Sequence, residues 1–80
     1  MTSNIVHRYF KKEVDDLIIL VRVNPIHLRG TEITVGPGRH VEQRELEFDA
    51  GIFDDLQIDG FKDASPMEFQ LYLSGLAWEV

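Results

Sequence analysis

The chain has 80 residues and a formal net charge of −6, with 44% hydrophobic and 28% charged residues and no cysteine. This size allows one domain, residues 1–80, and the composition is that of a folded globular chain rather than a disordered one. The lack of cysteine excludes disulfide bonds, thiolate nucleophiles and cysteine-based zinc sites. The longest apolar run, residues 17–21, is too short to cross a membrane, and the first residues do not resemble a signal peptide. We therefore expect a soluble, cytoplasmic protein.

Charge is divided unequally along the chain. Residues 1–44 hold seven Lys and Arg against five Asp and Glu, a net charge of +2, whereas residues 45–80 hold one Lys against nine acids, a net charge of −8. This asymmetry fits either attraction between the two halves within the fold or an acidic face that meets a basic partner. Binding to nucleic acid is disfavoured, because the few bases are dispersed within an acidic chain.

Residues 17–23 (Leu-Ile-Ile-Leu-Val-Arg-Val) predict a strand covered on both faces, because apolar side chains stand at odd and even positions alike. Asn24-Pro25 ends this strand, since proline cannot donate a backbone hydrogen bond to a sheet. Residues 4–12 carry apolar side chains at helical spacing, but their bases precede the acids that follow, which is the wrong order for a helix dipole. We expect residues 4–12 to form a strand paired with residues 17–23.

Residues 31–35 (Thr-Glu-Ile-Thr-Val) alternate in polarity and are followed by Gly36-Pro37-Gly38, a turn sequence. Residues 41–48 resume an alternating pattern, so these two segments predict a β-hairpin. The acids that alternate along the second strand indicate that one of its faces is exposed to solvent.

Residues 49–63 predict an acidic, irregular connection with a short strand or turn near Leu56–Ile58, because apolar and polar residues alternate there and Asp59-Gly60 follows as a turn signal. This segment mixes acids with apolar side chains, as a surface does when it recognises a basic, apolar groove. The alternative is that its apolar residues belong to the core and its acids face water. The candidate partner-binding residues are Phe53, Asp54, Asp55, Asp59 and Phe61.

The C-terminal segment allows two arrangements. Ser65 as N-cap, Pro66 at the first helical position and Glu68 three residues after the cap predict a helix over residues 66–74, stopped by Gly75 and followed by a strand over 76–80. Alternatively, Ser74-Gly75 is a hairpin turn between two strands. We favour the helix because its start and stop signals both stand at the correct offsets.

The expected fold is therefore α+β, an antiparallel sheet of four to five strands with one short C-terminal helix. An all-β sandwich or barrel is the alternative and follows from the Ser74-Gly75 hairpin.

No pattern predicts a catalytic, metal or cofactor site. His40 and Glu42 share a face of a strand, but two ligands are too few for a metal site. The acids of residues 49–63 lack the ligand spacing of a calcium loop, because apolar residues occupy the ligand positions. Gly36-Pro37-Gly38 lacks the ending of a phosphate-binding loop.

Three functions remain. We favour a non-catalytic protein-interaction or assembly module that associates with a protein partner or with itself, as a homo-oligomer, and not with nucleic acid or a membrane. The second is an acidic inhibitor or nucleic-acid mimic, in which carboxylates of residues 45–63 occupy a basic protein groove. The third is a small metal-dependent enzyme.

Overall fold

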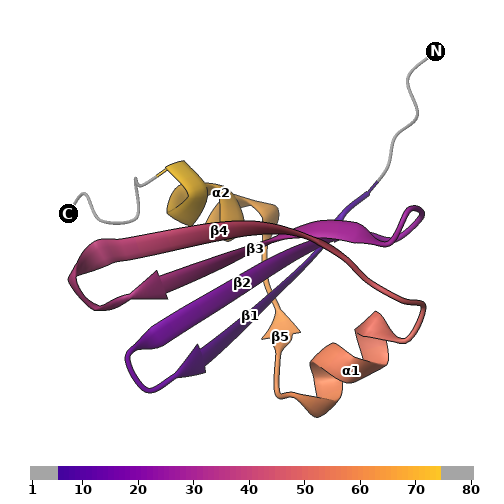
Figure 1. Ribbon diagram of the computed structural model, residues 1–80, viewed down its shortest axis with the longest axis horizontal. Coiled ribbons are helices and arrows are strands. Elements are labelled where there is room, and N and C mark those ends of the chain that lie inside the picture. Colours follow the sequence, from indigo (N-terminus) through magenta and orange to yellow (C-terminus); the bar gives the residue numbers. More distant parts are fainter. Residues whose placement is uncertain (1–5, 75–80) are drawn as a thin grey trace.

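A computed structural model describes residues 6–74 of the chain (Figure 1). It contains a five-stranded antiparallel sheet and two short helices, which confirms the predicted α+β class. The elements in chain order are β1 (Arg8–Val14), β2 (Leu17–Asn24), β3 (Arg29–Gly36), the 3-10 turn η1 (Pro37–Arg39), β4 (His40–Glu47), α1 (Ile52–Ile58), β5 (Lys62–Asp63) and α2 (Pro66–Ser74).

The strands lie in the order β4-β3-β2-β1-β5, and each pair is antiparallel. The predicted strand over residues 17–23 is β2, which lies between β1 and β3. Its predicted partner over residues 4–12 also pairs with it, but β1 covers residues 8–14. The predicted hairpin is confirmed as β3 and β4, joined by η1. Strand β3 extends beyond the expected residues 31–35 at both ends, whereas β4 begins and ends one residue before the expected 41–48.

The connection over residues 49–63 contains the helix α1, so the short strand expected at Leu56–Ile58 is wrong, whereas the turn signalled by Asp59-Gly60 is present, with Gly60 at a φ of 89°. Alternation over three residues is too short to distinguish a strand from a helix. Ile52, Phe53 and Leu56 have the spacing that places side chains on one side of a helix, and there they pack against the sheet. The two-residue strand β5 comes later, at residues 62–63.

Helix α2 confirms the prediction for residues 66–74, and it excludes the Ser74-Gly75 hairpin and the all-β alternative that followed from it. The Glu68 N–H donates to Ser65 Oγ at 3.0 Å, so Ser65 caps the helix as expected. The Glu68 side chain departs from a capping box, because its carboxylate pairs with Lys11 of β1. The strand expected over residues 76–80 and the Gly75 stop lie outside the described residues.

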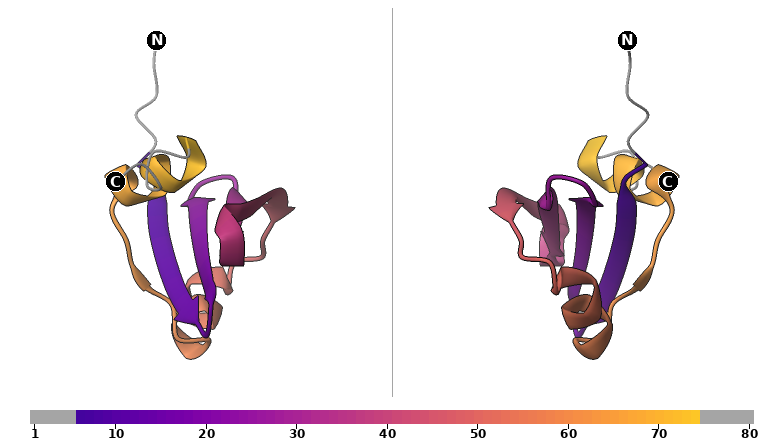
Figure 2. Two further views of the ribbon diagram at one scale, coloured as in Figure 1. Left: turned by 90° about the vertical axis from the view of Figure 1, so that its left-hand side faces the viewer. Right: turned by 90° about the vertical axis from the view of Figure 1, so that its right-hand side faces the viewer.

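The two helices cover opposite faces of the sheet, and Figure 2 shows the strands between them. On the α1 face, the buried side chains are Phe10, Val21, Val23 and Leu56. On the α2 face, they are Leu20, Ile33, Val35 and Phe69. Because neighbouring residues of a strand point to opposite faces, the continuous apolar run of β2 supplies both clusters.

Close packing leaves no room for a side chain at Gly30 of β3, which lies at the end of the sheet where β4 ends. A Cβ atom on Gly30 would lie 2.0 Å from the Arg22 carbonyl oxygen and 2.8 Å from Cε2 of Phe48. Only glycine leaves room for this approach. Phe48 follows β4 and packs into the α1 cluster, so it fastens the end of β4 to the core.

Candidate functional site

Helix α1 separates the five candidate residues of the acidic segment into two groups. Phe53 and Phe61 are half-buried and pack into the α1 cluster. The Phe53 ring lies 6.0 Å from the ring of Phe10, and the guanidinium of Arg8 lies 4.7 Å above its centroid. These rings therefore contribute to the core, which is the alternative role that the sequence allowed for them.

The carboxylates of Asp54, Asp55 and Asp59 are exposed. Ile58 stands among them with 81% of its surface exposed. This group forms the acidic α1 surface, defined here as Asp54, Asp55, Ile58 and Asp59. Asp54 and Asp55 occupy the first turn of α1, where negative charge also suits the helix dipole.

Strand β4 is a second surface, and its sequence pattern alone does not reveal it. It is eight residues long, and all of its residues except the half-buried Leu46 are exposed. It stands at one end of the strand order, and among residues 6–74 no strand pairs with its outer side. No strand of the described part of the chain therefore bonds to its backbone groups on that side.

The direction of these backbone groups follows from one hydrogen bond. The N–H of Phe48 donates to the Leu28 carbonyl at 2.7 Å, so Phe48 turns its backbone toward β3. Alternate residues of an antiparallel strand turn their N–H and C=O groups to opposite sides. Glu42 and Arg44 therefore also bond to β3. The residues that turn their backbone groups to the open side are Val41, Gln43, Glu45 and Glu47.

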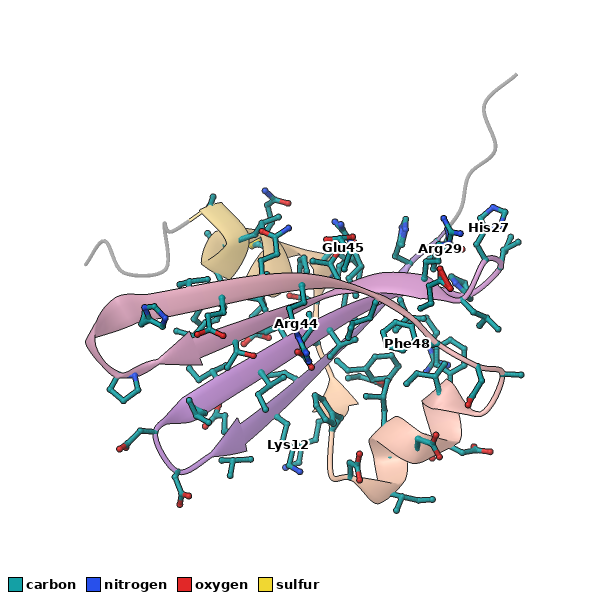
Figure 3. The ribbon with its side chains drawn as sticks, in the orientation of Figure 1. Lys12, His27, Arg29, Arg44, Glu45 and Phe48 are labelled. Atoms are coloured by element: carbon teal, nitrogen blue, oxygen red, sulfur yellow. The ribbon has the colours of Figure 1, made fainter. Side chains whose placement is uncertain are left out.

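The side chains of β4 alternate between the two faces of the sheet, and Figure 3 shows Arg44 and Glu45 on opposite sides of the strand. On the α1 face, Arg44 donates to Oε1 of Glu32 from Nη2 at 2.7 Å and from Nε at 3.1 Å. His40 Nε2 lies 3.2 Å from Oε2 of Glu42 on the same face. This face of β4 therefore presents a carboxylate and a guanidinium two residues apart.

On the α2 face, a row of polar side chains crosses three strands. Thr31, which is 1% exposed, accepts a hydrogen bond from Arg22 Nη2 at 3.2 Å and contacts both carboxylate oxygens of Glu45 at 3.0 Å. Gln43 Nε2 donates to Glu45 at 3.4 Å. The buried hydroxyl thus has partners on both sides, and Glu45 is held in place at the edge strand.

At the opposite edge, the Lys11 ammonium contacts the carboxylates of Glu68 and Glu13. The hydrogen bond to Glu68 raises the pKa of Lys11 above its ordinary value, against the lowering effect of burial. These ion pairs line a surface pocket of about 360 Å³ beside β5. The pocket is built around paired charges that connect β1 to α2.

Among the described residues, no group of three or more His, Asp or Glu side chains is placed to hold a metal ion. His40 and Glu42 are close to each other, as their spacing predicted, but no third such side chain joins them within residues 6–74. Neither α1 nor α2 is long and apolar enough to span a membrane.

The chain matches no known protein-family model, and neither a curated protein nor a solved structure matches it significantly.

Proposed function

We propose that the chain is a non-catalytic, cytoplasmic protein-interaction module that docks by adding a strand to the open edge of β4. The observation that carries this proposal is the length and exposure of β4, whose outer backbone groups have no strand partner among residues 6–74. An added strand forms backbone hydrogen bonds with such an edge, and alternate side chains provide specificity.

The side chains of β4 favour binding to a specific partner over nonspecific association. Natural edge strands are commonly protected from aggregation by charges, by short length or by a covering element. Strand β4 is long, and Val41 and Leu46 are its only aliphatic side chains. Its charged side chains discourage indiscriminate pairing, while a strand with complementary charges at matching positions can still add to it.

Gln43 offers a direct test, because its N–H faces the open side. Gln43→Pro removes that donor and leaves the hydrogen bonds between β4 and β3 in place. We expect Gln43→Pro to abolish partner recovery in affinity capture from the cells that express the chain. Gln43→Ala is the matched control, because it removes the side chain and keeps the N–H. Equal recovery with wild type and Gln43→Pro would refute strand addition at β4.

The acidic α1 surface is a second candidate, as an inhibitor or mimic that binds a basic protein groove. It is favoured by Ile58, an 81% exposed aliphatic side chain among three carboxylates. Exposed charges steer association and are screened by salt. In this case the triple variant Asp54→Asn, Asp55→Asn, Asp59→Asn should lose binding to basic proteins, whereas Gln43→Pro should retain it. Binding by the triple variant would exclude this role.

A further inference from the structure

We infer that the strand added to β4 is β4 of a second copy of this chain, antiparallel, with the two-fold axis at Gln43. This inference rests on the proposed function and names its partner. Joining the two edges would give a continuous sheet of ten strands from the five described in each copy. A contact of this kind uses the same surface on both subunits, so the surface must be complementary to itself.

The charges of β4 meet this requirement. A two-fold axis at Gln43, perpendicular to the sheet, places Glu42 opposite Arg44 of the second copy and Arg44 opposite its Glu42. Two identical ion pairs form across the contact between the two β4 strands, here called the joint, and both lie on the α1 face. Opposite charges directly across an antiparallel pair stabilise it, and like charges destabilise it.

The backbone of β4 supports the same register. Gln43 turns its N–H and C=O groups to the open side, and so do Val41 and Glu45. With the axis at Gln43, Gln43 bonds to its own counterpart, and Val41 bonds to Glu45 of the second copy. Glu42 and Arg44 then form non-hydrogen-bonded pairs, in which opposing side chains come closest, with Cα atoms about 4.5 Å apart.

Neighbouring registers lack this agreement. The axis can move to Glu42 or to Arg44 without turning any side chain to the wrong face. At Glu42 it places two carboxylates directly opposite each other, and at Arg44 it places two guanidinium groups there. The axis at Gln43 pairs seven of the eight residues of β4, from His40 to Leu46, whereas the axis at Glu42 pairs only five of them. Of these three registers, the one centred on Gln43 is therefore favoured by the charges of β4.

The existing ion pair of Arg44 is compatible with the joint. Arg44 donates to Glu32 of β3 through Nε and Nη2, and 65% of its side chain is exposed. A guanidinium carries five N–H donors in a plane, so it can bind Glu32 and Glu42 of the second copy together. Glu32, 21% exposed, fixes the guanidinium on the α1 face before association.

Exchanging single charges tests the register. Glu42→Arg places two pairs of like positive charges across the joint, and Arg44→Glu places two pairs of like negative charges. Each variant alone should self-associate about tenfold or more weakly than wild type in sedimentation velocity. A 1:1 mixture should form a heterodimer in native mass spectrometry, because the two arginines of one variant then face the two glutamates of the other across the joint. Formation of this heterodimer also proves that both variants are folded.

Asp16→Arg is the matched control, because it changes an exposed acid to arginine in the turn between β1 and β2, away from β4, and should leave self-association unchanged. A wild-type chain that stays monomeric up to about 1 mM overturns the inference, since even a Kd of 1 mM would be visible there. So do variants that self-associate as tightly as wild type, or a mixture without heterodimer. If the chain is monomeric yet captures another protein in a Gln43→Pro-sensitive way, only the second-copy inference fails and strand addition stands.

Discussion

The two edges of the sheet end in different ways. At one edge, β5 has two residues and is flanked by ion pairs, of Arg8 with Asp63 and of Lys11 with Glu68 of α2. At the other edge, β4 has eight residues, and within residues 6–74 no strand pairs with its outer side. A short edge offers too few backbone groups for an added strand, whereas β4 offers a full row.

The contrast between the two edges points to β4, rather than β5, as the edge at which another strand can add. The β5 edge is protected because β5 is short and because ion pairs link its neighbour β1 to α2, whereas the β4 edge is exposed.

Proline substitution should distinguish the two sides of β4 most strongly. Arg44→Pro removes a hydrogen bond to β3 and should lower the free energy of unfolding by about 3 kcal/mol. Gln43→Pro removes only an outward N–H and should lower it by less than about 1 kcal/mol. Urea unfolding of both variants measures the difference. Equal losses would show that the assigned directions of the backbone groups are wrong.

Gly30→Ala should loosen the end of β4. The new Cβ would meet the Arg22 carbonyl at 2.0 Å and the Phe48 ring at 2.8 Å, so the chain must shift at a cost of about 2 kcal/mol. Gly36→Ala is the control in the same strand, because its Cβ would meet no atom closer than 3.7 Å. Thermal unfolding compares them, and a Gly30→Ala variant as stable as Gly36→Ala would contradict the packing described for Phe48.

The stabilisation from the Lys11–Glu68 ion pair, near the β5 edge of the sheet, should depend on pH in alkaline solution. Because Glu68 raises the pKa of folded Lys11, the ion pair stabilises the fold fully below the unfolded value of about 10.4, and the stabilisation is lost as pH rises through the folded value. Wild type should exceed Glu68→Gln in unfolding free energy by about 0.5 kcal/mol at neutral pH, since the pair is partly exposed. The difference should shrink above about pH 10.5. A difference that grows there would contradict the pairing.

The local patterns of this chain predicted much of the fold. Strands β2, β3 and β4 were predictable because apolar residues alternate with polar ones, or run continuously, between turn signals at Asn24-Pro25 and Gly36-Pro37-Gly38. Helix α2 was predictable because the Ser65 cap and Pro66 stand at fixed offsets. Each signal lies within a few residues of the element that it starts or ends.

What the sequence could not predict depends on distant contacts. Helix α1 forms because Leu56 and its neighbours pack on Phe10 and Val21, residues more than thirty positions earlier in the chain. The identity of the edge strand depends on β5 pairing with β1 rather than with β4. The acids of α1 can be read from the sequence, but the strand order is needed to show that β4 is an edge strand with no strand on its outer side among the described residues.

Residue-resolved amide hydrogen exchange across a range of chain concentrations tests the central claim most directly. If β4 is the docking strand, the N–H groups of Val41, Gln43 and Glu45 should exchange quickly in dilute solution and become protected as the concentration rises. Those of Lys62 and Asp63 at the opposite edge should not change. Protection of the β4 groups that is independent of both concentration and added partner, or that appears on α1 instead, would contradict it.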